Sequence, residues 1–355
     1  MANLMAGSLN NNFQRLEDDR PEVISILINN SCNLHCRHCY LQTHPQDKYL
    51  TNDQWMIFFS SLFRDIQPRV LCFAGKEVFI NNNSVQLLLD AIKMRNKMQP
   101  IDKRRTEIGV ITNGTLIHNY IDQLQEISPD YFDISIDGLP ETHDAIRGKG
   151  TFKKLQSNLT WLTDSYPGPV WITNTLCSEN YNSLPEFLQF YDQNYRVSKF
   201  SIGFYKQTDS SDAHLVLSQS NITELTDSII PKLSQLPLSQ PIEIIFEMDC
   251  TQPELLEHFA DAGFAHPVDA IACNTLHYDN EVTLHFNTAR VPTGLWRAIR
   301  VTPEGFWLAG EDLIDVKNYR KNAIGKLDEY GYDSRKLYEA GLLSIEHSNY
   351  SYFPA

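Results

Sequence analysis

The stretch VISILINNSCNLHCRHCY, residues 23–40, joins a short apolar run to three closely spaced cysteines. Its first six residues have the β-branched, apolar composition of a buried strand. Cys32, Cys36 and Cys39 follow directly, in the pattern Cys-x3-Cys-x2-Cys. The sequence therefore predicts a strand that leads into one tight loop carrying three thiols.

Short apolar runs then alternate with helical patterns as far as about Tyr205. Strand–helix alternation favours parallel strands joined by right-handed crossovers, which predicts an α/β fold. Six units are too few for a closed eight-stranded barrel, and they suit either a partial (β/α)6 TIM-like barrel or a doubly wound sheet. In both, chemistry gathers at the carboxyl ends of the strands. The expected strands are 23–28, 69–75, 107–112, 131–136, 170–176 and 199–205, and the expected helices are 54–63, 84–94, 115–124, 152–162 and 184–193.

The pattern changes after about residue 207. We therefore expect a flexible N-terminal segment over 1–20, a partial barrel over 21–207 and a smaller α+β lobe over 208–355. In that lobe the expected helices are 222–233, 253–263 and about 334–342, and the expected strands are 242–248 and short segments near 282–287, 295–301 and 306–309.

Charge and hydropathy exclude several classes of protein. The formal net charge is −14, which disfavours nucleic-acid binding, because tracking phosphates needs clustered cations. The one basic stretch, 93–105, is interpreted as a solvated helix end, with a site for an acidic peptide as the alternative. No apolar run reaches membrane-spanning length, and the first residues lack the pattern of a secretory signal. These observations predict a cytoplasmic protein without a membrane segment.

The seven cysteines are an odd number in a long chain, which makes a disulfide framework a poor explanation. Thiolates are soft ligands that suit iron–sulfur clusters and zinc. Three thiols favour a cluster with one open iron, since a closed zinc site needs four ligands; His35 or His38 as a fourth ligand keeps zinc open. A thioredoxin-type pair would leave Cys32 unexplained.

The loop CNLHCRHCY at 32–40 resembles the cluster motif of the radical S-adenosylmethionine (SAM) superfamily, Cys-x3-Cys-x2-Cys with an adjoining aromatic residue. FAGKE at 73–77 resembles the Gly-Gly-Glu motif of that family, and TNGT at 112–115 resembles its TNG turn. SIDG at 135–138 leads into HDAIRGKGTF at 143–152, which is similar to the family's SxDG…HDxxRGxGxF segment. The resemblance covers roughly residues 20–205.

This resemblance implies an enzyme with one [4Fe–4S] cluster on Cys32, Cys36 and Cys39, and with SAM on the open iron. Reductive cleavage of SAM would yield a 5′-deoxyadenosyl radical that abstracts a hydrogen atom from the substrate. Electrons would come from a donor of the ferredoxin or flavodoxin type. In such enzymes the cofactor carries the difficult chemistry, and the protein binds, orients and excludes water.

The resemblance also implies which residues bind SAM. By their positions in the family motifs, Tyr40 would pack near the adenine, Gly75 and Glu77 would contact the ammonium group, and Ser135 and Arg147 would contact the ribose and the carboxylate. Asn113 and Asp137 would contact ligand or hold the turns in which they lie. The second glycine of Gly-Gly-Glu is Lys76 here. We expect Lys76 to point away or to add a contact to the SAM carboxylate.

Segment 297–327 looks like the hairpin of the SPASM and twitch lobes of peptide-modifying radical SAM enzymes, but it lacks their cysteines. Only Cys250 and Cys273 lie beyond the barrel, too few for a conventional auxiliary cubane, and we expect a lobe without one. Cys72 and Cys177 are expected to be small buried core residues. Cys250 and Cys273 are also expected to be structural, with a hydrogen-atom donor as the alternative.

These resemblances favour a maturase that modifies a ribosomally synthesised precursor peptide. Within that branch the chain is similar to the splicease-type maturases of peptides with nitrile-hydratase-like leaders, which excise tyramine to leave an α-keto-β-amino acid. A small leader-binding partner would then be separate, since no such recognition domain is apparent in the sequence. The alternatives are an enzyme acting on a small metabolite, such as a sugar or nucleoside, and an inactive binding scaffold.

Overall fold

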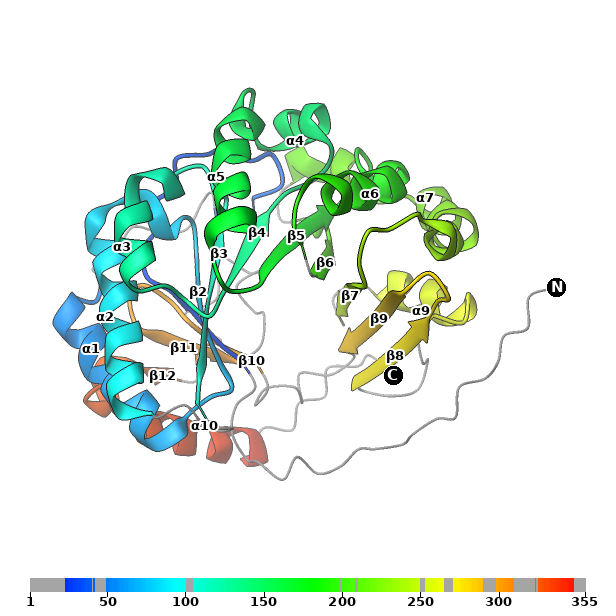
Figure 1. Cartoon of the computed structure of the whole chain (residues 1–355). Coiled ribbons are helices and arrows are strands. Elements are labelled where there is room, and N and C mark those ends of the chain that lie inside the picture. The colour runs from blue at the N-terminus through cyan, green and yellow to red at the C-terminus, as the bar shows by residue number, and fades with distance from the viewer. Residues whose placement is uncertain are drawn as a thin grey trace.

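The computed structural model describes residues 23–39, 41, 49–99, 105–197, 199–207, 210–249, 253–264, 271–289, 298–309, 323 and 325–347. One sheet of 12 strands organises this part of the chain, and its order is β12-β11-β10-β1-β2-β3-β4-β5-β6-β7-β9-β8. The sheet curves into an open arc, with most of the helices along its outer side (Figure 1). The strands are β1 (Val23–Leu27), β2 (Val70–Ala74), β3 (Glu107–Thr112), β4 (Tyr131–Ser135), β5 (Val170–Leu176), β6 (Lys199–Phe204), β7 (Ile242–Asp249), β8 (Ile271–His277), β9 (Val282–Ala289), β10 (Ala298–Val301), β11 (Phe306–Ala309) and β12 (Gly325–Lys326).

Neighbouring strands are parallel from β10 through β1 to β7 and on to β9, and antiparallel pairs close both ends of the sheet. The carboxyl ends of the parallel strands therefore meet along a single edge. Crossover helices follow most of them. The helices are α1 (Asn52–Ser61), α2 (Asn82–Met98), α3 (Ile121–Glu126), α4 (Pro140–Arg147), α5 (Thr151–Ser165), α6 (Leu184–Asn194), α7 (Gln219–Glu224), α8 (Ile230–Lys232), α9 (Pro253–Asp261) and α10 (Ser334–His347).

The strands alternate between an apolar face and a more polar one. In β4, Phe132 and Ile134 are fully buried in the main apolar core, whereas Tyr131, Asp133 and Ser135 lie on the opposite face of the sheet. The same alternation recurs in β5 and β6. The apolar face packs against the helices, and the polar face is left for the concave side of the arc.

All six strands expected before residue 207 are present within one residue of their expected ends. The expected helix 115–124 is instead a short 3-10 turn at Ile117–Tyr120 followed by α3. The expected helix 222–233 is interrupted by a π-helical turn at Leu225–Ile229. Pro231 follows that turn, and a proline cannot donate the backbone hydrogen bond of a regular helix.

The sheet runs without a break across the expected domain boundary near residue 207. β7 continues parallel to β6, and β10 pairs in parallel with β1. The division at that residue stays a prediction, and the two expected parts share one sheet. Among the described residues, no helix is both long and apolar enough to cross a membrane.

Candidate metal centre

The cysteine loop leaves the carboxyl end of β1 and lies along the shared edge of the sheet. Cys36 is buried, and Cys32 and Cys39 are half-buried; all three are free thiols. Burial raises the pKa of Cys36 to about 12 and also raises the pKa of Cys32. The three thiols lie within eight residues of one loop, from Cys32 to Cys39.

The donor set of this loop fits an iron–sulfur cluster. Buried thiols such as those of Cys32 and Cys36 resist ionisation unless a metal neutralises them. Within the described part of the chain, no group of three or more His, Cys, Asp or Glu side chains could hold a single metal ion. Ligands of a cubane bind separate irons and need not converge on one point, so this arrangement is compatible with a cluster.

Asparagines connect the loop to the end of β3. The Asn113 side-chain amide donates to Asn33 Oδ1 at 3.0 Å and to the Cys32 sulfur at 3.8 Å. The backbone N–H of Leu34 donates to the same sulfur at 3.4 Å, and Asn33 donates to Thr115 Oγ1 at 2.8 Å. Donors directed at a thiolate sulfur stabilise its charge and tune any iron that it binds.

The turn after β2 brings the backbone close to β1. Gly75 has φ +117°, and a Cβ there would lie 3.3 Å from Leu27 Cα. This geometry accounts for glycine at the first motif position. Lys76 is half-buried, and the described residues give it no hydrogen bond or ion pair. Its expected contact with SAM remains a prediction.

Glu77 is 1% exposed and caps the 3-10 turn that follows it. Its carboxylate accepts hydrogen bonds from Thr112 Oγ1 at 2.6 Å, from the Asn113 N–H at 2.9 Å and from the Phe79 N–H at 2.9 Å. Burial raises its pKa despite these bonds. Glu77 thus joins the ends of β2 and β3 beside the loop, and its expected contact with the SAM ammonium remains a prediction.

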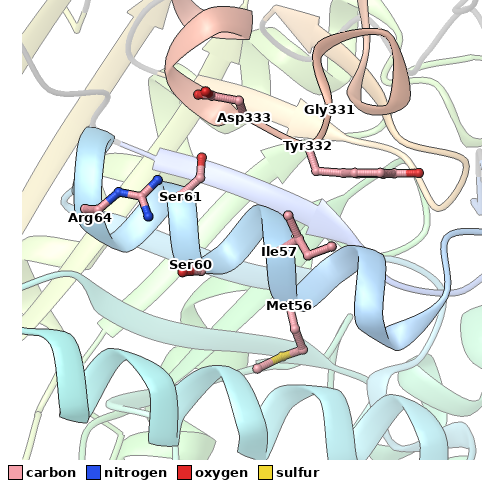
Figure 2. Close-up of a pocket in the computed structure, with 8 residues that line it drawn as sticks. All are labelled: Met56, Ile57, Ser60, Ser61, Arg64, Gly331, Tyr332 and Asp333. Carbon is pink, nitrogen blue, oxygen red and sulfur yellow. The ribbon is translucent and has the colours of Figure 1, made fainter.

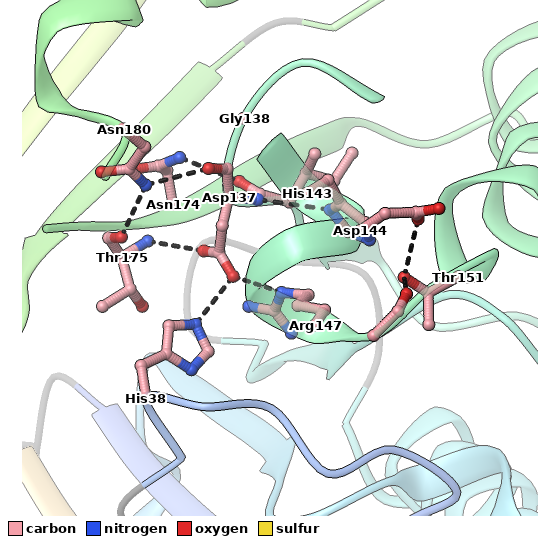
Figure 3. A network of polar contacts seen from close by, with 12 residues as sticks. His38, Asp137, Gly138, His143, Asp144, Arg147, Thr151, Asn174, Thr175 and Asn180 are labelled. Carbon is pink, nitrogen blue, oxygen red and sulfur yellow. Dashed lines mark hydrogen bonds and ion pairs between the residues drawn. The ribbon is translucent and has the colours of Figure 1, made fainter. Parts of the chain in front are cut away.

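Asp137 is the centre of a polar network at the end of β4 (Figure 3). Its Oδ2 accepts from Arg147 Nε and lies 2.7 Å from His38 Nε2, and its Oδ1 accepts from the Thr175 N–H at 2.9 Å. The Asn180 side chain donates to the Asp137 carbonyl at 2.9 Å. Burial alone would raise the pKa of Asp137, but Arg147 and His38 outweigh it and hold the pKa far below its usual range.

A second set of contacts docks the loop on α4 and on the segment after β5. The Arg37 N–H donates to the Ile146 carbonyl at 3.0 Å. The Arg37 guanidinium forms a two-pronged ion pair with Glu179, at 2.7 and 2.9 Å, and lies 2.6 Å from His214 Nε2. The loop is therefore held at both its ends by elements distant in sequence.

Below the carboxyl edge, the concave face carries an aromatic layer. Tyr131 stacks on Trp171 with ring centroids 4.0 Å apart, and Lys199 Nζ lies 4.4 Å from the Trp171 ring centre. A Cβ on Gly109 would lie 1.9 Å from Tyr131 Cζ, so this glycine is what lets the tyrosine ring cross β3. Asp133 accepts from Thr173 Oγ1 at 2.6 and 2.7 Å on the same face.

The remaining predicted residues have varied outcomes. Ser135 is half-buried at the end of β4, near the expected SAM edge. Cys72 and Cys177 are buried, as expected. Tyr40 and Cys250 lie outside the described residues, as does the side chain of Cys273.

Two cavities are lined by described residues near α1. One of about 690 Å³ opens beside the start of the cysteine loop and is lined by Asn29, Ser31 and the amino-terminal turn of α2. Another, of about 430 Å³, lies between α1 and the residues just before α10 (Figure 2). It includes Arg64 and Tyr332 and has no part of the cysteine loop in its lining.

The sequence interpretation missed several residues that shape this site. Asn33, Arg37, Glu179 and Asn180 hold the loop and the Asp137 turn. His38, which the sequence suggests only as an alternative zinc ligand, bonds Asp137. None lies in a local pattern that identifies its partner. His38 and Asp137, for example, are 99 residues apart.

Residues 26–191 match the family model described as the radical SAM superfamily. A probable GTP 3′,8-cyclase of Methanocaldococcus jannaschii is 24% identical over 170 residues, which cover 47% of this chain and 54% of that protein. The sporulation killing factor maturation protein SkfB of Bacillus subtilis is 24% identical over 180 residues, covering 49% and 40%. The chain thus matches only about half the length of these curated relatives.

Solved structures with the same fold include Streptococcus suis SuiB, bound to S-adenosylmethionine or to its precursor peptide SuiA. The TM-scores are 0.58 and 0.59 at 12% identity, and the matches cover 84% and 83% of this chain and 62% and 61% of SuiB. At this identity the likeness concerns the fold alone.

Proposed function

Because the chain carries a radical SAM domain over residues 26–191, we propose that it is a radical SAM enzyme that modifies a ribosomally synthesised precursor peptide. One observation carries the enzymatic part of this proposal. Three free thiols sit on one loop that is hydrogen-bonded into the carboxyl edge of a parallel sheet. In α/β folds that edge is where catalytic groups gather.

Cys32, Cys36 and Cys39 would hold one [4Fe–4S] cluster, with SAM on the remaining iron. When bound, this pair supplies a 5′-deoxyadenosyl radical for hydrogen-atom abstraction. The protein's own residues would stabilise and orient the cluster and SAM. Asn113 donates to the Cys32 sulfur. Charge-assisted bonds of this kind tune a cluster's potential.

SAM would lie across the ends of β2, β3 and β4. Gly75 and Glu77 would approach its ammonium group, and Ser135 its ribose. Arg147 uses Nε for Asp137, which leaves its terminal nitrogens for the SAM carboxylate, a geometry that suits a guanidinium fork. Tyr40, Lys76, Asn113 and Asp137 complete the proposed set, Asn113 and Asp137 as ligand contacts or as residues that hold their turns.

A peptide substrate is favoured by the chain's relatives. SkfB is named as a maturation protein, and SuiB, which shares the fold, has been solved with a precursor peptide. We propose the same class of substrate for the present chain. We also propose that it uses an external electron donor and a separate leader-binding partner. Excision of tyramine from the peptide is the finer form of the proposal, and it rests on sequence resemblance.

The polypeptide architecture belongs to the same proposal. The first six strands and their helices would form a partial (β/α)6 barrel, and the remainder a SPASM- or twitch-like lobe without an auxiliary cluster. A chain organised in this way holds a single cluster. The alternative is a small-metabolite substrate, and its support is the similarity to the GTP 3′,8-cyclase.

The test is anaerobic reconstitution followed by incubation with SAM and dithionite. We expect the wild type to bind one four-iron cluster and to release 5′-deoxyadenosine, and the Cys32/Cys36/Cys39→Ala variant to do neither. Cys177→Ala, which removes a buried thiol outside the loop, is the matched control and should retain the cluster. Equal iron binding by the triple variant and the wild type would contradict the assignment.

The substrate class needs a second measurement. Peptides encoded beside the gene are incubated with the reconstituted enzyme and analysed by mass spectrometry, alongside nucleoside triphosphates. A mass change in a peptide supports the maturase. A modified nucleotide with unchanged peptides would favour the small-metabolite alternative.

A further inference from the structure

Asp137 occupies an unusual position for a buried carboxylate. It is 0% exposed, and its bonds reach the cysteine loop through His38, α4 through Arg147 and β5 through Thr175 (Figure 3). One oxygen, Oδ2, serves both His38 and Arg147. A carboxylate needed only to hold its own turn would bond nearby backbone. This one instead joins the loop to the helix behind it.

Arg147, the second charged partner of Asp137, belongs to a helix that contacts the cysteine loop. The backbone N–H of Arg37, the residue after Cys36, donates to the carbonyl of Ile146, the residue before Arg147, at 3.0 Å. Asp137 neutralises the guanidinium of Arg147. The charge beside the cysteines is therefore a balance between one carboxylate and one guanidinium, both buried.

His38 lies between two of the cysteines in sequence, and its side chain is 7% exposed. Its Nε2 points to Asp137, which fixes the ring and leaves Nδ1 on the other side. In metal sites, a carboxylate that bonds the ring of a histidine orients that ring and sets the local charge. The same arrangement here acts on a histidine of the loop itself.

We propose that Asp137 is a positioning residue for the iron–sulfur cluster: it orients His38 within the loop and balances Arg147, and so sets the reduction potential of the cluster. This inference rests on the proposed function, since it concerns the cluster that the loop would hold. Reduction adds one negative charge to the cluster. Removing the negative charge of Asp137 would leave Arg147 unbalanced and stabilise the reduced form.

The experiment compares the wild type, Asp137→Asn and Asp133→Asn after anaerobic reconstitution. Asp133 is the matched control because it is a buried acid within β4, the strand that Asp137 follows, and has no contact to the loop among the described residues. The readouts are iron content, the electron paramagnetic resonance (EPR) spectrum of the reduced cluster with and without SAM, and the midpoint potential. We expect Asp137→Asn to raise the potential, alter the EPR spectrum and lower cluster affinity by about ten- to a hundredfold. Asp133→Asn should match the wild type.

His38→Leu breaks the His38–Asp137 contact from the loop side, and it is the test variant if Asp137→Asn does not fold. Its cluster affinity should fall as well, and in the double variant the losses should not add, because one bond is removed twice. An Asp137→Asn protein with the midpoint potential and EPR spectrum of the wild type would overturn the proposal, and so would an equal shift of the potential in Asp133→Asn. Unchanged cluster affinity in His38→Leu, or additive losses of affinity in the double variant, would also overturn it. A wild type that holds no cluster would contradict the proposed function itself, and the inference with it.

Discussion

At the scale of single residues, the surroundings shift the pKa values of two carboxylates in and after β4 in opposite directions. Asp133 and Asp137 are both buried carboxylates, one within the strand and the other just beyond its end. Burial raises the pKa of Asp133 to about 6, because Thr173 and Lys199 only partly offset it. Asp137 has Arg147 and His38 in contact, and its pKa is strongly lowered. A direct cationic contact, not depth, decides which carboxylate stays charged.

The raised pKa of Asp133 predicts a pH dependence of stability. An unfolded aspartate titrates near 3.9, so the folded protein binds this proton more tightly, and the resulting stabilisation is present below about pH 4 and lost as pH rises through about 6. Asp133→Asn removes the effect. As pH rises from about 4 to above 6, the unfolding free energy of the wild type should therefore fall relative to that of the variant, by at most about 3 kcal/mol. Urea denaturation of both proteins measures it, and parallel pH profiles would contradict it.

At the scale of elements, the turn between α4 and α5 fixes where Arg147 lies. Gly148 and Gly150 adopt φ of +120° and +79°, which turns the chain sharply. Asp144 spans this turn, and its carboxylate accepts from the Gly150 N–H at 2.6 Å and the Phe152 N–H at 2.8 Å. It therefore caps the start of α5 from within α4.

Loss of this cap should destabilise the protein without touching the loop. We expect Asp144→Ala to lower the unfolding free energy by about 1–3 kcal/mol, since two backbone donors lose their partner. Glu141→Ala, at an exposed position of the same helix, should change it by no more than about 0.5 kcal/mol. Thermal or urea unfolding at neutral pH measures both. Similar values for the two variants would show that the turn does not depend on Asp144.

At the scale of the whole molecule, strands distant in sequence complete the part that bears the cysteines. β10 pairs with β1 over residues 298–301 and 23–26. Trp307 of β11 is fully buried and packs edge-to-face on Phe58 of α1, with ring centroids 6.1 Å apart. The strand that leads into the cysteine loop is thus internal in the sheet, with β10 on one side and β2 on the other.

This topology predicts that residues 21–207 do not fold by themselves. In that fragment β1 loses β10 and β6 loses β7, which exposes two apolar strand edges. We expect poor dispersion of amide signals in NMR spectra and no cooperative urea transition, in contrast to the full chain. A fragment that unfolds cooperatively at the midpoint of the full chain would instead support an independent domain ending near residue 207.

Local sequence determined much of the fold and which residues are the candidate metal ligands. Strand and helix periods are short-range properties, and the six expected strands lie where the alternation predicts them. The three cysteines lie within eight residues, so their common loop follows from chain connectivity alone. Gly75 is required by a local turn with φ +117°, and its expected contact with SAM stays a prediction.

Tertiary structure alone decided what surrounds those cysteines. The contacts His38–Asp137, Asn33–Asn113 and Arg37–Glu179 span 99, 80 and 142 residues, and no local pattern specifies such partners. The pairing of β10 with β1 is of the same kind. The physical reason is that spacing along the chain sets which groups share an element. The charge and hydrogen bonds that each group experiences depend on which elements the fold brings to the same edge of the sheet.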